Sequence, residues 1–440
     1  MKKYFRANLN FLPNLYGSQF LRNIFVLTSS SVVSYFIAFL MMPIISRIYS
    51  QEDLGVYYSL VAIVAIVSSF INMRLDIAIP LVKNRMHAMR LLQVSVVLTG
   101  LMTVPFTGLF YWASQTGYFG FEHYPLWATG AFAGLIILNV VYISIYAVLH
   151  YEQDYVQASK VAVLNMASRN SAQIGFKFLF DGPLGMAVGE VLARCVSIFY
   201  MIKTSRLLRS RASYLFHWHG LLNVLRENKA YPVYVAPSSL MLAISTSLTT
   251  PVILSLYGSA MAGQYALAAT VAIIPITILG KSVNNVYSRS FSIAFHGKKY
   301  DELLGLMKRT LISTAALSLI MYLTLAMVSA PAFPIVFGSG WEQAGEICIF
   351  LALSFIMYLP VMVLEKSMFL FGREKVKLFY DGVNVAILVV IFYSAQANHW
   401  NIIAVVKLIA ISKNALAFIQ LAHVYLIVKR GVVDRLAFKA

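Results

Sequence analysis

The chain has 440 residues, of which 60% are hydrophobic and only 12% are charged. Its mean hydropathy of +0.74 excludes an ordinary soluble protein, in which roughly a quarter of the residues are charged. The formal net charge of +18 does not indicate a nucleic acid partner, because most of the basic residues lie in alternate short loops between apolar segments, as in membrane proteins.

Twelve apolar segments follow one another along the chain. Each has about 20 residues, enough for a helix to cross a hydrocarbon core of about 30 Å. The sequence therefore predicts an all-α polytopic membrane protein with twelve transmembrane helices. The predicted spans are 23–46, 56–81, 91–112, 126–149, 161–180, 184–203, 231–256, 264–288, 310–336, 346–370, 380–396 and 401–428.

The stretch that joins the first two spans, PIISRIYSQEDLGVY, returns 208 residues later as PVILSLYGSAMAGQY. Pro43 matches Pro251 and Gly55 matches Gly263 without a gap, which indicates an internal duplication. Six spans per copy give both copies the same orientation. We therefore expect two six-helix lobes, related as a parallel internal repeat around a central cavity.

The predicted organisation has five parts. Basic residues collect in the two ends and in the connector between the lobes, which places these parts in the cytoplasm. The connector also contains Leu221, Leu222 and Leu225, a spacing typical of an amphipathic helix on the membrane surface. The parts are a cytoplasmic N-terminal segment at 1–22, a first lobe at 23–203, a basic connector at 204–230, a second lobe at 231–428 and a cytoplasmic tail at 429–440.

Few residues suggest chemistry in the loops. Ser50 and Asp53 have the spacing of a helix capping box, which explains Glu52 and Asp53 better than a catalytic acidic pair does. Cys195 and Cys348 lie in different spans, so neither a disulfide nor a zinc site is expected. No Walker sequence is present, and we expect no metal, no cofactor and no direct use of ATP.

Eight basic residues lie inside the predicted spans. A charge at the centre of a bilayer costs at least ~2.5–3.5 kcal/mol, so such residues usually face water and mark function. Lys366 beside Glu365, and Lys407 near a span end, are explained by snorkelling to the headgroups. The eight are Arg74, Arg169, Lys177, Arg194, Lys281, Lys366, Lys407 and Lys413.

Two of these arginines differ in their local partners. Arg194 follows Glu190 by four residues, the favourable order for an ion pair on one helix, so pairing and ligand binding both remain open. Arg74 precedes Asp76 by two residues, which in a helix leaves Arg74 without a local partner.

The predicted span at 161–180 has a polar stripe. Asn165, Arg169, Gln173 and Lys177 recur every four residues along one side of a helix that contains no acid. Such a stripe cannot face lipid, and we expect it to line a water-filled lumen. Because few acids lie within the spans, this lumen is expected to be cationic and to select an anionic cargo that carries phosphate or carboxylate.

The repeat architecture, together with PIISRIYSQEDLGVYYS and RLDIAIPL around the second span, resembles the Wzx-type O-antigen and oligosaccharide flippases. These belong to the polysaccharide transport branch of the multidrug/oligosaccharidyl-lipid/polysaccharide exporter superfamily. The resemblance implies a non-enzymatic transporter of the bacterial inner membrane that takes part in lipopolysaccharide or related polysaccharide biosynthesis. Its cargo would be an undecaprenyl-pyrophosphate-linked oligosaccharide that moves from the cytoplasmic to the periplasmic leaflet, beside a polymerase and a ligase.

Two alternatives remain open: a multidrug antiporter of the same superfamily, and a membrane polysaccharide polymerase or ligase. Asp76 is the candidate for coupling to protons or sodium, while the identity of the sugar does not follow from the sequence. The predicted substrate-binding residues are Arg74, Asn165, Arg169, Gln173, Lys177, Arg194, Lys281 and Lys413.

Overall fold

A computed structural model describes residues 19–117, 124–209, 218–297 and 300–437. Within these residues every regular element is a helix, so the prediction of an all-α protein is confirmed. Most of the predicted N-terminal segment, part of the connector and the last three residues of the tail lie outside the described residues.

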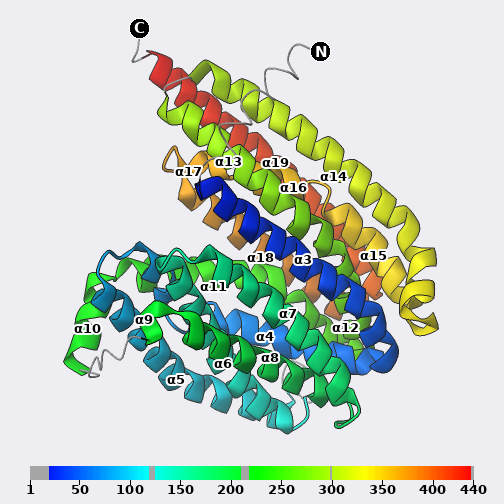
Figure 1. Cartoon of the computed structure of the whole chain (residues 1–440). Helices are drawn as coiled ribbons and strands as arrows, with labels where there is room; N and C mark the ends of the chain where they lie inside the picture. The colour runs from blue at the N-terminus through cyan, green and yellow to red at the C-terminus, as the bar shows by residue number, and fades with distance from the viewer. Residues whose placement is uncertain (1–18, 118–123, 210–217, 298–299, 438–440) are drawn as a thin grey trace.

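The helices of the first predicted lobe lie together in Figure 1, where α5, α6 and α8 form one group. Helices α7 and α8 pack along their length, and α3 packs against α7. The bounds are α3 (Gln19–Ile48), α4 (Gln51–Ser68), α5 (Arg85–Thr116), α6 (Trp127–Tyr151), α7 (Tyr155–Lys177) and α8 (Leu184–Thr204).

The connector contains α9 (Arg206–Arg209) and α10 (Trp218–Glu227), and α10 covers the stretch predicted as an amphipathic helix. The second group of helices includes α14, α15 and α19, which lie side by side at the upper right of Figure 1. The bounds are η4 (Tyr231–Val235), α11 (Ala236–Ser247), α12 (Thr249–Pro275), η5 (Ile276–Gly280), α13 (Lys281–His296), α14 (Tyr300–Phe337), η6 (Ser339–Trp341), α15 (Glu342–Ser354), α16 (Tyr358–Leu364), α17 (Lys366–Phe369), α18 (Glu374–Ala397) and α19 (Ile402–Ala437).

Nine helical stretches in the described residues are long and apolar enough to cross a membrane, or ten if the bent pair at residues 339–369 is one span. The difference from the predicted twelve has two causes. The 66-residue stretch Tyr231–His296 covers two predicted spans, and its backbone breaks at Gly258, where φ is 83°. Helix α7 is not among the stretches that qualify, because its polar stripe lowers its hydropathy.

The two copies of the repeated stretch meet at one contact. A Cβ atom on Gly55 would lie 1.9 Å from the Ser259 carbonyl oxygen, and a Cβ on Gly263 would lie 1.9 Å from the Gln51 carbonyl oxygen. Gln51 and Ser259 are themselves 208 residues apart, so the contact is reciprocal. This is the geometry expected when α4 and α12 cross at the axis of an approximate two-fold repeat.

Two predicted spans are not continuous helices. The span predicted at 56–81 begins as α4, whose Ser50–Asp53 capping box is confirmed, but the helix ends at Ser68. Its remainder turns through Met73 and Arg74, both with positive φ, into two short 3-10 helices. The span predicted at 346–370 breaks between Ser354 and Tyr358 with a bend of 40°. Apolar composition predicted these segments as single spans, because it does not report breaks in the backbone.

The end of the molecule where α3 passes into α4 is closed by the segment between α14 and α15. The Gly340 carbonyl accepts hydrogen bonds from the Gln51 side chain and, at 2.7 Å, from Gln264. The Trp341 indole donates to the Ser46 carbonyl at 2.9 Å, and Arg47 donates to the Ile335 carbonyl at 2.9 Å. Elements from both predicted lobes are therefore joined by hydrogen bonds at this end.

Candidate functional site

Glu190 in α8 is the centre of a buried polar cluster in the first lobe. Its Oε1 lies 3.1 Å from Nη2 of Arg194, and its Oε2 lies 3.7 Å from Nε of Arg169 in α7. The Tyr57 hydroxyl of α4 donates a hydrogen bond to the same Oε2 at 3.0 Å. We call these four residues the Glu190 cluster. One carboxylate therefore balances two guanidinium groups, which leaves one net positive charge.

The polar stripe of α7 does not face an open lumen along its whole length. Asn165 and Gln173 are buried, with Asn165 donating to Ser197 at 3.0 Å and Gln173 donating to the Tyr57 hydroxyl at 2.8 Å. The Asn165 amide therefore links α7 to α8, and the Gln173 amide links α7 to α4. Arg169, by contrast, keeps 29% of its side chain exposed beside the buried Glu190. The stripe therefore serves both helix packing and the charged cluster.

Lys177 closes α7 near the α3–α4 turn. Its Nζ lies 3.7 Å from Asp53 Oδ2 and 4.8 Å from the centre of the Tyr49 ring. The Tyr49 hydroxyl donates to the Gln173 carbonyl at 2.7 Å, and burial, followed by the nearby Asp53 charge, raises the pKa of Tyr49 to about 12. The acid missing from the predicted span is thus supplied by α4, far away in the sequence.

The prediction that Arg74 has no local partner is wrong. Its Nη2 lies 3.8 Å from Asp76 Oδ2. The prediction assumed a helix, but Arg74 has left-handed backbone angles after the end of α4, so the two side chains can meet. Asp76 is buried and also accepts a hydrogen bond from Asn72 at 3.0 Å.

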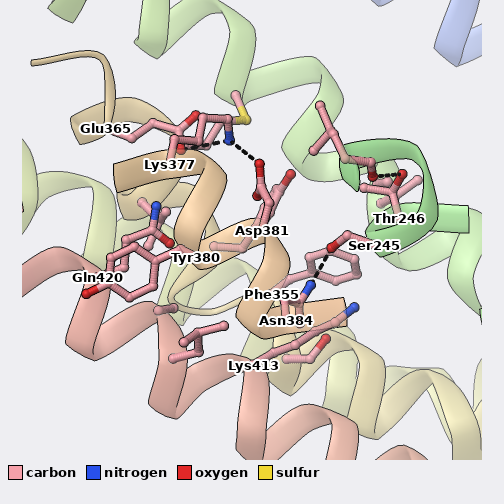
Figure 2. Close-up of a pocket in the computed structure, with 18 residues that line it drawn as sticks. Ser245, Thr246, Phe355, Glu365, Lys377, Tyr380, Asp381, Asn384, Lys413 and Gln420 are labelled. Carbon is pink, nitrogen blue, oxygen red and sulfur yellow. Dashed lines mark hydrogen bonds and ion pairs between the residues drawn. The ribbon is translucent and has the colours of Figure 1, made fainter. Parts of the chain in front are cut away.

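The second lobe contains a cavity of about 170 Å³ between α11, α12, α15, α16, α18 and α19. Lys377 of α18 lies 3.1 Å from Glu365 and 3.7 Å from Asp381. Dashed lines mark these two ion pairs in Figure 2. Glu365 pairs with Lys377 of α18 and not with its sequence neighbour Lys366, whose ammonium group lies over the Phe369 ring.

Lys413 and Gln420 line the same cavity from α19. Asn384 of α18 donates a hydrogen bond to Ser245 of α11 across it, and Phe355 and Tyr358 add aromatic surface. Among the predicted binding residues whose side chains the structure describes, Lys413 alone lines this cavity. The side chain of Lys281, at the start of α13, lies outside the described residues.

The structure thus groups Arg169 and Arg194 around Glu190, with Gln173 joined to them through Tyr57. Asn165 instead bonds to Ser197, and Lys177, Arg74 and Lys413 have other surroundings. Sequence reasoning missed Tyr57, which no local pattern reveals, and Lys377, whose spacing of four from Asp381 was a usable signal. No group of three or more metal-ligating side chains occurs in the part of the chain that the structure describes. The arrangement offers charge and hydrogen bonds, as a binding site for a polar anion does.

Three solved transporters share this fold. The lipid II flippase MurJ, in an inward closed conformation, matches with a TM-score of 0.65 at 14% identity, over 94% of this chain and 91% of that chain. A mutant of the Vibrio cholerae MATE transporter VcmN matches at 0.59 and 12% identity, over 94% and 97%. A transporter of the MOP superfamily from Pyrococcus furiosus matches at 0.56 and 15% identity, over 94% and 96%.

No curated protein sequence matches the chain closely enough to count as a relative. A family model described as "Polysaccharide biosynthesis protein" matches residues 127–346, which is half of the chain. The family match and the shared transporter fold agree with the resemblance to the polysaccharide transport branch of the exporter superfamily. The protein is therefore a multi-pass membrane protein that belongs to the polysaccharide biosynthesis protein family.

Proposed function

We propose that the protein is a flippase that moves an undecaprenyl-pyrophosphate-linked oligosaccharide from the cytoplasmic to the periplasmic leaflet of the bacterial inner membrane. The observation that carries this proposal is the Glu190 cluster, in which two arginines share one carboxylate inside the membrane. Its surplus positive charge suits the pyrophosphate group of such a lipid.

The geometry of Arg169 and Arg194 supports an anion as the ligand. Both side chains are partly exposed, at 29% and 19%, while Glu190 is buried beneath them. The Nε of Arg169 is buried without a hydrogen-bond acceptor among the described residues. Since guanidinium groups bind phosphate oxygens through paired N–H groups, an incoming phosphate would supply the acceptors that Glu190 cannot.

The mechanism that we propose is alternating access. The contact between Gly55 and Gly263 closes the α3–α4 end, and the opposite end admits the headgroup while the polyprenyl tail stays in lipid. The pyrophosphate is held by Arg169 and Arg194, with Lys177, Arg74, Lys281 and Lys413 contributing along the path and Asn165 and Gln173 fixing the helix that carries Arg169. Opening the α3–α4 end then releases the headgroup to the other leaflet.

Coupling to a proton or sodium gradient is assigned to Asp76. Asp76 is buried in the turn after α4 and accepts a hydrogen bond from Asn72. We expect Asp76→Asn to abolish the dependence of export on the gradient. Unchanged gradient dependence in a well-expressed variant would remove this assignment.

The proposed function is tested by deletion of the gene in its own host, followed by analysis of lipid-linked oligosaccharides on each leaflet. We expect an undecaprenyl-linked unit to accumulate on the cytoplasmic leaflet. The wild type should relieve this accumulation and the Arg169→Ala/Lys177→Ala variant should not. Normal surface glycan in the deletion strain would contradict the proposal, as would full complementation by that variant.

A multidrug antiporter is the second candidate, and the cavity of the second lobe favours it. Glu365 and Asp381 share the single ammonium group of Lys377, so this trio has one surplus negative charge that suits a cation. Altered tolerance of the deletion strain to cationic drugs, with normal surface glycan, would support this candidate. A membrane polymerase or ligase would instead leave the unpolymerised unit on the periplasmic leaflet.

A further inference from the structure

The cavity of the second lobe contains a charge without a counter-ion. Lys413 contributes to its wall, and the structure gives it neither an ion pair nor a hydrogen bond with any described residue. It lies 11 residues into α19, about 17 Å from the start of the helix at 1.5 Å per residue, and thus deep in the bilayer. An unpaired charge at such a depth is costly, which indicates a ligand.

Both acidic side chains that line the cavity already have an ion-pair partner. Glu365 and Asp381 both lie within 4 Å of Lys377, and Figure 2 draws their ion pairs at the end of the cavity away from Lys413. Lys413 lines the cavity together with Asn384 and Phe355. Two positive and two negative groups therefore face the cavity. The trio of Lys377, Glu365 and Asp381 has one surplus negative charge, and Lys413 is a cation without an ion pair to any described residue.

A second polar group also lacks a partner. Gln420, two helical turns after Lys413, is 8% exposed and lines the cavity. Its amide makes no hydrogen bond to any of the described residues. Its amide is therefore available to a polar ligand in the cavity. Lys413 and Gln420 lie on the same side of α19, seven residues apart.

The remaining wall suits a sugar. Phe355, Tyr358 and Tyr380 provide aromatic surface, while Asn384 and Ser245 provide an amide and a hydroxyl group. A volume of about 170 Å³ is below the ~300–1,000 Å³ of sites for drug-sized ligands, so the cavity fits one small ring rather than a long chain.

We infer that this cavity is a subsite for a carboxylate-bearing sugar of the transported oligosaccharide, with the carboxylate on Lys413 and sugar hydroxyls on Asn384 and Gln420. This inference rests on the proposed function. It assigns the pyrophosphate and the acidic sugar of the cargo to two different sites. A pyrophosphate, with at least two negative charges, is repelled by Glu365 and Asp381 and is balanced better by Arg169 and Arg194. A single carboxylate matches the one free ammonium group.

The test uses the purified full chain in lipid nanodiscs and two probes that differ only at the acidic group, methyl glucuronide and methyl glucoside. A charge-assisted hydrogen bond contributes about 1.5–3 kcal/mol, so we expect the glucuronide to bind at least about tenfold more tightly. Lys413→Gln should bring the ratio to about one, and Lys413→Arg should preserve it. Ligand-observed NMR titration measures both dissociation constants.

Lys407→Gln is the matched control, because Lys407 lies on the same helix, is exposed and stacks over Phe350 outside the cavity. We expect this variant to retain the full preference for the glucuronide. Equal binding of the two probes by the wild type would overturn the inference. So would a preference that survives Lys413→Gln, or displacement of the glucuronide by acetate at the same concentration.

Translocation assays separate this inference from the proposed function. Wild-type vesicles should flip a lipid-linked acidic oligosaccharide faster than a neutral one, and Lys413→Gln should remove only this difference. If the wild type flips both equally, the subsite is wrong while the flippase stands. If the wild type flips neither, the proposed function fails, whatever the binding titrations give.

Discussion

At the scale of single residues, the Glu190 carboxylate controls the charge of the first lobe. It accepts from Tyr57 and lies within 4 Å of both Arg169 and Arg194. Burying ions is costly, so removing one member of such a group leaves the others uncompensated. Glu190 therefore holds the two arginines close together although they repel each other, and leaves them partly exposed for a ligand.

We expect Glu190→Gln to lower the free energy of unfolding by about 3 kcal/mol, because two guanidinium groups that are only partly exposed lose their counter-ion. The thermal midpoint of the purified protein in detergent should fall clearly. Glu342→Gln is the control, since Glu342 lies exposed at the start of α15. An unchanged midpoint in Glu190→Gln would mean that water, not Glu190, stabilises the arginines.

Arg169 offers a second residue-scale prediction. If the positive charge of Arg169 matters more for binding than its paired hydrogen bonds, Arg169→Lys retains much of the export activity that Arg169→Ala loses. If bidentate contacts with phosphate dominate, both variants lose export about equally. Complementation of the deletion strain, normalised to protein amount in the membrane, decides between these outcomes, and equal wild-type activity of both variants would exclude Arg169 from the site.

Local spacing predicted some of these contacts and not others. The Glu190–Arg194 pair follows from two residues one helical turn apart, and the structure confirms it. The ion pair between Lys177 and Asp53 joins residues from α7 and α4, which no spacing rule connects. A single sequence reports periodicity along one helix, whereas contacts between helices depend on how the bundle packs.

At the scale of elements, α4 and α12 approach so closely that only glycine fits at their crossing. The repeated stretch predicted an equivalence of Gly55 and Gly263, and the structure adds that the two lie against each other's helix backbones. By contrast, the breaks after Ser68 and Ser354 could not be predicted, because an apolar segment has the same composition whether its backbone is continuous or bent.

We expect Gly55→Ala to force α4 and α12 apart, because its Cβ would lie 1.9 Å from the Ser259 carbonyl oxygen. The thermal midpoint should fall, and a cysteine placed at the fully buried Ala262 should become reactive toward a membrane-impermeant thiol reagent. Gly134→Ala serves as the control, since nothing lies within 4 Å of its Cβ. Unchanged labelling with an unchanged midpoint would show that this crossing is not the closed end of the molecule.

At the scale of the whole molecule, the distribution of basic residues and the parallel repeat predict that both termini and the connector lie on the same side of the membrane. A reporter active only outside the cytoplasm should be active when fused after Asn398, between α18 and α19, and inactive when fused after Arg430. The opposite pattern would invert the proposed direction of transport, and activity at both positions would contradict the twelve-span topology.

The most direct test of the proposed flippase is translocation by the purified protein in vesicles that contain a fluorescent undecaprenyl-pyrophosphate oligosaccharide. Loss of fluorescence on addition of a membrane-impermeant quencher reports the fraction of lipid on the outer leaflet. We expect the wild type to make nearly all of the lipid accessible within minutes, and Arg169→Ala/Arg194→Ala to leave about half protected, as in vesicles without protein. Equal protection with the wild type and with empty vesicles would contradict the flippase, and wild-type rates in the double variant would contradict the Glu190 cluster as its site.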